Sequence, residues 1–281
     1  MAYPTVSAPY GLKPINLVGG QVFSGSTREL PIQYGYATNI FYGDFVVLSR
    51  GFATRAAVST GTGSNQVTGI FLGCSYTNPT TKQKTFSQYW PASTLAGDAV
   101  AIVCDDPDTV FKAVVCSSGT TVASGGLALI GTNLSMIDNS TGNVNTGDST
   151  NAVLAPTATP VTSILPVRCV GVVPDTSYSF TATGSSSSTT ITLTGAGTPQ
   201  AIPVGTSVGY LASNGQLINT GSFVSSAAVA GATSVTINSA IAVPGAVTAI
   251  PSSSTVVFTV YPEILVKLNL LVHGYYSSTT A

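Results

Sequence analysis

Three carboxylates stand close together in the segment Val100–Val115, which reads VAIVCDDPDTVFKAVV. Asp105, Asp106 and Asp108 have the side chains that Ca²⁺ prefers, but an EF-hand loop also needs alternating ligands, a central glycine and a closing glutamate. Proline presets φ for the second position of a turn, and aspartates accept hydrogen bonds from the backbone two residues on. The flanking apolar runs indicate strands. The sequence therefore predicts a tight turn between two strands, without a metal site.

Catalytic constellations are sparse in the rest of the chain. His273 is the only histidine and ends the apolar run ILVKLNLLVH, which favours a strand-end or core position. The motifs GxSxG, HExxH, GxxxxGK[ST] and GxGxxG are absent. A glycosidase needs two carboxylates that meet in space, and Asp44, Asp98, Asp138 and Asp148 are candidates, but each lies beside Gly or Asn in a turn-like setting. We therefore expect no enzymatic activity, no cofactor and no catalytic, cofactor-binding or metal-binding residues.

One cluster of aromatic residues is a candidate contact site. Phe86, Tyr89 and Trp90 lie together in FSQYWPAST. Such clusters stack on sugars or anchor protein interfaces. Ordinary packing within a strand is the alternative.

Composition limits the classes of partner. Nine Lys and Arg oppose ten Asp and Glu among 281 residues, so the chain offers neither the counterion release that binds nucleic acid nor attraction to an anionic membrane. Near-zero charge with 44% hydrophobic residues is typical of a subunit inside an assembly, and an ordinary neutral β protein is the alternative. We expect no signal peptide and no membrane span. For a chain made in a reducing cytoplasm, four isolated cysteines predict free thiols: Cys74, Cys104, Cys116 and Cys169.

Alternating and β-branched runs dominate the chain and predict an all-β fold. The strand candidates are Phe45–Ser49, Val67–Cys74, Thr85–Trp90, Ala99–Cys104, Val110–Val115, Pro166–Val173 and Ile264–Val272. A Gly-Asp pair begins two similar segments, YGDFVVL and AGDAVAIV, and Gly-Thr begins the looser copy VGTSVGYL. We interpret these pairs as strand starts, because Gly adopts positive φ and the short polar residue bonds the local backbone. The Asn-Gly turn in Ser213–Leu217 predicts a hairpin.

Charge divides the chain into parts. From Thr176 to Pro262 no residue is charged, and short alternating strands are separated by Gly, Ser and Asn-Gly turns. This pattern predicts a small β-sandwich at 176–262, inserted into a discontinuous β-barrel or β-sandwich main domain at 21–175 and 263–281. A disordered Ser/Thr-rich spacer is the alternative, but the stretch contains many Ile, Leu, Val and Phe residues.

The first 20 residues predict an extended N-terminal arm. Pro4, Pro9 and Pro14 recur every five residues, and proline disfavours a helix both at its own position and at the preceding residue. An arm of this kind can lie across a neighbouring subunit, with tyrosines that supply apolar area. The candidate docking residues are Tyr3, Pro4, Pro9, Tyr10 and Leu12. The alternative is that the arm covers an edge of its own barrel.

Five passages resemble the capsid decoration (cement) proteins of tailed bacteriophages. They are PYGLKPINLVGG, FYGDFVVL, GIFLGCSYTNPTTKQKTFSQYWPAST, GDAVAIVCDDPDTVFKAVV and EILVKLNLLVHGYYSSTTA. The resemblance covers roughly two thirds of the chain and leaves out the uncharged insert. It implies a non-enzymatic virion protein on the capsid surface that binds the major capsid protein and itself, as a homodimer or homotrimer, and neither nucleic acid nor membrane. The alternative is a β-module adhesin or tail-fibre component that binds host glycans through Tyr89, Trp90 and the insert.

Overall fold

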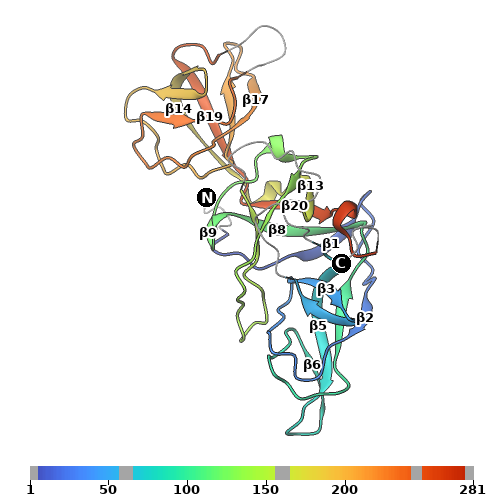
Figure 1. Cartoon of the computed structure of the whole chain (residues 1–281). Coiled ribbons are helices and arrows are strands. Elements are labelled where there is room, and N and C mark those ends of the chain that lie inside the picture. The colour runs from blue at the N-terminus through green and yellow to red at the C-terminus, as the bar shows by residue number, and fades with distance from the viewer. Residues whose placement is uncertain (1–5, 57–65, 156–164, 242–248, 276–281) are drawn as a thin grey trace.

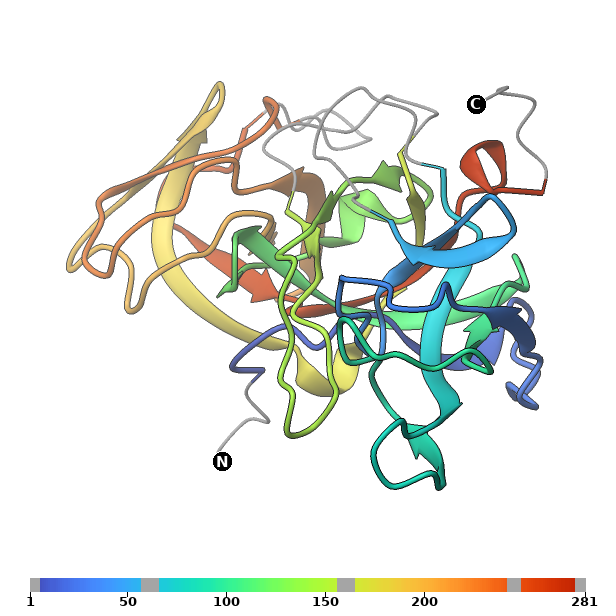
Figure 2. The same cartoon turned by 60° about the horizontal axis from the view of Figure 1, so that its bottom comes forward.

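A computed structural model of the chain describes residues 6–56, 66–155, 165–241 and 249–275. Within these residues the regular elements are β-strands and three 3-10 turns, so the prediction of an all-β fold is confirmed. The strands form three sheets in an elongated molecule (Figure 1). The second sheet lies between the other two, which occupy opposite ends (Figures 1 and 2).

The first sheet is a small barrel that is nearly closed. Its strands run in the order β2 (Arg28–Pro31), β7 (Val100–Cys104), β5 (Gly69–Thr77), β3 (Phe45–Ser49) and β4 (Phe52–Arg55). The end strands β2 and β4 contact each other, and β6 (Lys84–Ser87) extends the sheet beside β5. Trp90 and Phe71 are fully buried in its core.

The second sheet takes its strands from both ends of the chain. Its order is β10 (Asn133–Leu134), β13 (Val167–Val172), β20 (Glu263–Leu268), β8 (Thr109–Ser118), β12 (Ala152–Leu154) and β11 (Met136–Ile137). Two strands join it at β8, namely β1 (Lys13–Leu17) and β9 (Thr121–Val122). Because β13 pairs antiparallel with β20, the chain between them leaves and re-enters the sheet at one place.

The third sheet is built from that intervening chain. Its order is β17 (Leu217–Phe223), β16 (Ser207–Leu211), β19 (Ser254–Val260), β14 (Tyr178–Ser187), β15 (Thr190–Leu193) and β18 (Ser234–Thr236). It has a core of its own, which includes Phe258 and Val208. The hairpin predicted at Ser213–Leu217 is confirmed, since β16 and β17 pair across it and Gly215 has φ +79°. Whether this stretch folds by itself stays a prediction.

The third sheet is joined tightly to the second. Val204 and Phe223 pack in the same apolar cluster as Leu129 and Val266 of the main body. The Ser124 N–H donates to the Val204 carbonyl over 2.9 Å, and a Cβ on Gly205 would lie 1.8 Å from the Ser124 oxygen. The contact therefore requires glycine, both for this approach and for the φ of +83°.

The three strand starts predicted from Gly-Asp and Gly-Thr are confirmed. Asp44 lies directly before β3, Asp98 two residues before β7, and Thr206 directly before β16. Asp44 accepts a hydrogen bond from the Phe41 N–H over 2.8 Å, and the Thr206 hydroxyl donates to the Pro203 carbonyl over 2.7 Å. In both cases the short polar side chain bonds the backbone three residues back. The third pair differs from the prediction, since Gly97 does not adopt positive φ and Asp98 accepts from the distant Thr77 N–H over 3.0 Å.

The N-terminal arm is shorter than the sequence predicts. Lys13–Leu17 is strand β1 of the second sheet, and Leu12 is fully buried in the main core. Apolar side chains of this segment find their partners within the same chain, which is why it does not project as an arm of 20 residues.

Candidate functional site

The aspartate segment is a turn, as predicted. It joins β7 to β8; the Asp108 N–H donates to Asp106 Oδ1 over 2.9 Å, and the Thr109 N–H donates to the Asp106 carbonyl over 3.1 Å. Asp106 therefore closes the turn, and Lys267 lies 3.9 Å from Asp108. Among the described residues, no group of three or more His, Cys, Asp or Glu side chains is arranged to hold a metal ion.

Asp105 anchors the C-terminal segment to this turn. Arg28 Nε lies 2.9 Å from Asp105 Oδ2, and the Arg28 guanidinium stacks on the Tyr275 ring at 5.0 Å. His273 Nε2 lies 3.1 Å from the Asp105 carbonyl oxygen. His273 Nδ1 accepts from the Tyr275 N–H over 3.3 Å, so Nε2 carries the proton and donates. The histidine is buried, as predicted, in a structural position.

The most enzyme-like constellation is a buried network around Asp44. Arg55 Nε lies 3.2 Å from Asp44 Oδ2, and Arg55 Nη2 also bonds Asp138. Asp44 Oδ1 accepts from the Ser149 hydroxyl over 2.6 Å and from Asn151 Nδ2 over 2.9 Å. The network joins the start of β3 and the end of β4 to the loop before β12, so it connects the first two sheets.

This network does not have the geometry of a carboxylate pair for acid–base chemistry. Asp44 is fully buried, and its oxygens are occupied by the donors described above. Burial raises the pKa of Asp44, while the bonds from Ser149 and Phe41 and the charge of Arg55 oppose that rise. Asp98 and Asp148 lie elsewhere, paired with Lys84 and Lys13, each at 3.2 Å. The four aspartates therefore do not meet in one open site.

A second buried carboxylate holds the N-terminal segment. Glu263 Oε1 accepts from the Tyr10 hydroxyl and lies 3.3 Å from Lys112 Nζ. Lys13 Nζ lies 4.7 Å from the centre of the Tyr10 ring. Burial and the bond to Glu263 raise the pKa of Tyr10, which keeps its hydroxyl protonated.

These contacts correct the predicted docking residues. Tyr10 and Leu12 are bound within their own chain, and Pro9 is buried as well. Tyr3 and Pro4 lie outside the described residues. Residues 9–12 instead pack against the body of their own chain, which was the alternative prediction.

The aromatic cluster is divided by the fold. Trp90 is 0% exposed, packs edge-on against Tyr76 and donates through Nε1 to the Tyr36 carbonyl. Tyr89 stacks on Phe41. Phe86 is the most exposed of the three, with 77% of the residue accessible, and Tyr89 is partly exposed. Trp90 is thus a core residue and not an interface residue; it lies beyond the end of β6 and is held by a single β-bridge to Ile40.

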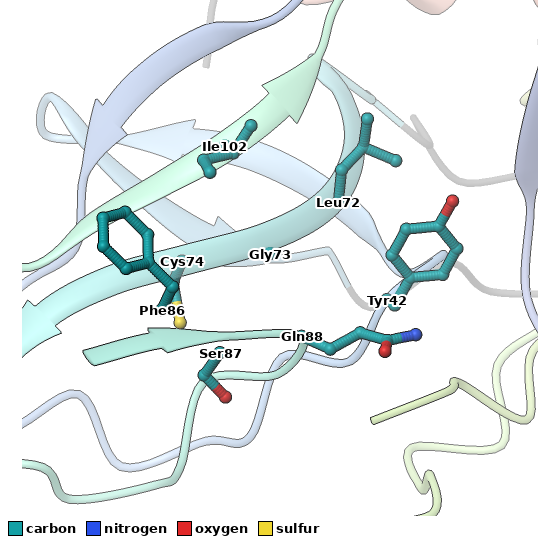
Figure 3. Close-up of a pocket in the computed structure, with 8 residues that line it drawn as sticks. All are labelled: Tyr42, Leu72, Gly73, Cys74, Phe86, Ser87, Gln88 and Ile102. Atoms are coloured by element: carbon teal, nitrogen blue, oxygen red, sulfur yellow. The ribbon is translucent and has the colours of Figure 1, made fainter. Parts of the chain in front are cut away.

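Beside Phe86 lies an open groove of about 500 Å³, here called the Phe86 groove (Figure 3). Its apolar part consists of Leu72, Phe86 and Ile102, and its polar part of Tyr42, Ser87 and Gln88. The Phe86 ring lies over β5 on the side of Ile102, whereas Tyr42 and Gln88 lie at the other end (Figure 3). None of the residues that line it is charged. The sequence reasoning missed this groove. The apolar runs of β5 and β7 predict strands, but they do not show which side chains of those strands remain exposed.

The thiols are free and buried, as predicted. Burial raises the pKa of Cys74 to about 12 and those of Cys116 and Cys169 to about 11. Thiols with such values are not thiolates at neutral pH, so they are poor nucleophiles.

Comparisons with known proteins add no identification: no family model, no curated protein and no solved structure matches the chain. Among the described residues, no helix is long and apolar enough to cross a membrane.

Proposed function

We propose that this protein is a non-enzymatic structural protein of a phage virion, made in the host cytoplasm. It binds the outer surface of the head, contacts the major capsid protein and stabilises the shell by bridging capsid subunits. One support is that the passages that resemble decoration proteins build a single body. Their described parts supply β1, β3, β5 to β8 and β20, which are seven of the fourteen strands in the first two sheets and include the long strands β5 and β8.

The observation that carries the proposal is the distribution of exposed apolar side chains on an elongated, charge-poor molecule. Three apolar residues in different parts of the molecule are each at least 74% exposed. They are Val22 beside the second sheet, Phe86 on the barrel and Val229 in the part built around the third sheet. The barrel and the third sheet lie at opposite ends (Figure 2). A bridging protein needs separate contact surfaces, and a few side chains that become fully buried at such a surface contribute most of the binding free energy.

The buried charges support the same function. Asp44, Arg55 and Glu263 are engaged in contacts between strands and sheets. The residues best suited to chemistry are therefore used to hold the body together, which suits a protein under mechanical load.

The test is attachment to purified, undecorated phage heads, measured by co-sedimentation. Removing residues 1–5 takes away Tyr3 and Pro4 but leaves Pro9, Tyr10 and Leu12 in place. We expect the shortened chain to melt at the same temperature as the full chain and to bind heads at least tenfold more weakly. This is a better truncation than removal of residues 1–12, which would excise a fully buried leucine.

Two results would contradict these expectations separately. If the shortened and full chains bind heads equally, the N-terminus is not the anchor. If the full chain binds whole host cells but not heads, the glycan-binding alternative replaces the proposal. Trp90, one of the residues on which that alternative depends, is fully buried, so glycan binding would be left to Tyr89 and the insert.

A further inference from the structure

The tip of the β16–β17 hairpin carries the only Asn-Gly step in the chain, at Asn214 and Gly215. Both residues are exposed, and Gly215 adopts φ +79° with nothing within 4 Å of an added Cβ. The Ala212 N–H donates to the Gln216 carbonyl over 2.9 Å, and the Gly215 N–H donates to the Ala212 carbonyl over 2.8 Å. The hairpin therefore holds a defined turn that is open to water.

The side chain of Asn214 is folded back along its own backbone. Its Oδ1 accepts a hydrogen bond from the Gln216 N–H over 3.0 Å. This bond keeps the amide carbon Cγ near the peptide that joins Asn214 to Gly215. It also draws electron density from the side-chain carbonyl, as a donor to a developing oxyanion does. Glycine places no Cβ beside that peptide nitrogen, so the arrangement suits attack of the Gly215 nitrogen on Cγ.

From this arrangement we propose that Asn214 is a site of spontaneous deamidation in the folded protein. The Gly215 nitrogen forms a bond to Cγ and loses its proton, the Cγ–Nδ2 bond breaks, and ammonia leaves. Water then opens the cyclic imide at one of its carbonyls. Opening at Cγ gives aspartate, and opening at the main-chain carbonyl gives isoaspartate.

The product changes the one long part of the chain that has no charge. From Thr176 to Pro262 no residue is charged, so a carboxylate at position 214 is the only charge in this stretch. Ser213 and Gly215, the neighbours of Asn214, line an uncharged groove of about 630 Å³ together with residues 251–255. Isoaspartate also lengthens the main chain, which disrupts the hydrogen bonds of the turn. Deamidation therefore alters both the charge and the shape of this tip.

Two other asparagines provide controls within the same chain. Asn143 is exposed and accepts the same kind of bond from the backbone N–H two residues on, over 2.9 Å, but Val144 follows it. Asn78 also accepts such a bond over 2.9 Å, but Pro79 follows it and has no N–H to lose. A side chain that is folded back in this way is therefore common to all three, and only Asn214 is followed by glycine.

The experiment is incubation of the folded full chain in mildly alkaline and in mildly acidic buffer, followed by peptide mapping with mass spectrometry. Replacement of an amide NH2 by OH gives the mass shift, and ion exchange separates the more acidic product. We expect conversion at Asn214 to be faster in the alkaline buffer, because the attacking nitrogen must lose its proton. We expect it to be about tenfold faster than conversion at Asn143, because the β-branched side chain of Val144 hinders the attacking nitrogen.

Two variants exchange these settings. Gly215→Ala should slow conversion at Asn214, and Val144→Gly, in a different loop, should create a second site at Asn143. Because the reaction is measured on the isolated chain, its outcome does not depend on attachment to phage heads.

The positive control is a synthetic peptide with the sequence of residues 211–218. The proposal is overturned if this peptide converts while Asn214 of the folded chain does not, because the turn then protects the site. It is also overturned if Asn143 converts as fast as Asn214, or if neither variant changes the rate at its site.

Discussion

At the scale of residues, the polar groups of this chain serve to hold segments that are far apart in sequence. His273 shows this most clearly, since its two ring nitrogens bond the β7–β8 turn and the backbone of Tyr275. A second proton on Nδ1 would face the Tyr275 N–H, which is itself a donor. Burial is the main cause that lowers the pKa of His273 below its usual value.

The lowered pKa predicts how stability depends on pH. In the unfolded chain the ring titrates near its ordinary value of about 6.5, whereas the folded chain resists protonation. The stabilisation from His273 is therefore present above that value and is lost as the pH falls through the lower, folded-state pKa. Because it is the only histidine, one NMR titration of the imidazole gives the folded-state pKa directly.

The matching variant is His273→Gln, which cannot titrate. We expect the free energy of unfolding to fall more steeply for the wild-type chain than for this variant between about pH 7 and pH 5. An imidazole that titrates above its ordinary value would contradict this assignment.

At the scale of elements, the contact between the loop at Ser124 and the start of β16 holds the third sheet against the body. Gly205→Ala would place a Cβ against the Ser124 carbonyl and add strain at positive φ. Gly195→Ala is the matched control, because Gly195 also has positive φ, +76°, but nothing lies within 4 Å of its added Cβ. We expect the control to cost about 1–2 kcal/mol and Gly205→Ala clearly more, measured by urea unfolding. If the two variants lose equal free energy of unfolding, the contact between the Ser124 loop and Gly205 is not tightly packed.

At the scale of the whole molecule, the uncharged insert and the main body share part of a core. The Val173 N–H donates to the Glu263 carbonyl over 3.2 Å, so a short Gly/Ser linker can join Asp175 to Glu263 after deletion of 176–262. We expect the remaining body to fold with a lower melting temperature, because it loses Phe223 and Val204 from its apolar cluster.

The size of that loss has an independent control. Phe223→Ala in the full chain should cost about 3–5 kcal/mol, the usual range for a buried phenylalanine. If the deletion lowers the free energy of unfolding of the body by about as much as Phe223→Ala does in the full chain, the loss of the Phe223 contact accounts for the effect of the deletion. An insoluble deletion product would mean that 176–262 is part of one folding unit with the body.

Local signals in the sequence were sufficient for seven of the twenty described strands and for the main turns, although the predicted strands Thr85–Trp90 and Ile264–Val272 run past the ends of β6 at Ser87 and β20 at Leu268. The segment Phe45–Ser49 is a strand with the predicted bounds, and the Asp106 turn and the Asn-Gly hairpin form where their residues predict. These features depend on alternation and on the φ preferences and short-range hydrogen bonds of Gly, Pro, Asp and Asn. Such interactions lie within a few residues, so the sequence by itself determined them.

Which side chains face a core, and which carboxylates meet, was decided only by the tertiary structure. Leu12 and Trp90 were candidates for contact surfaces, with packing inside their own chain as the alternative, and the structure shows both fully buried. Asp44 bonds Ser149, which is 105 residues away along the chain. The order of strands within a sheet sets such contacts, and strand order is not encoded in local periodicity, because pairing depends on the combined burial of all the strands at once.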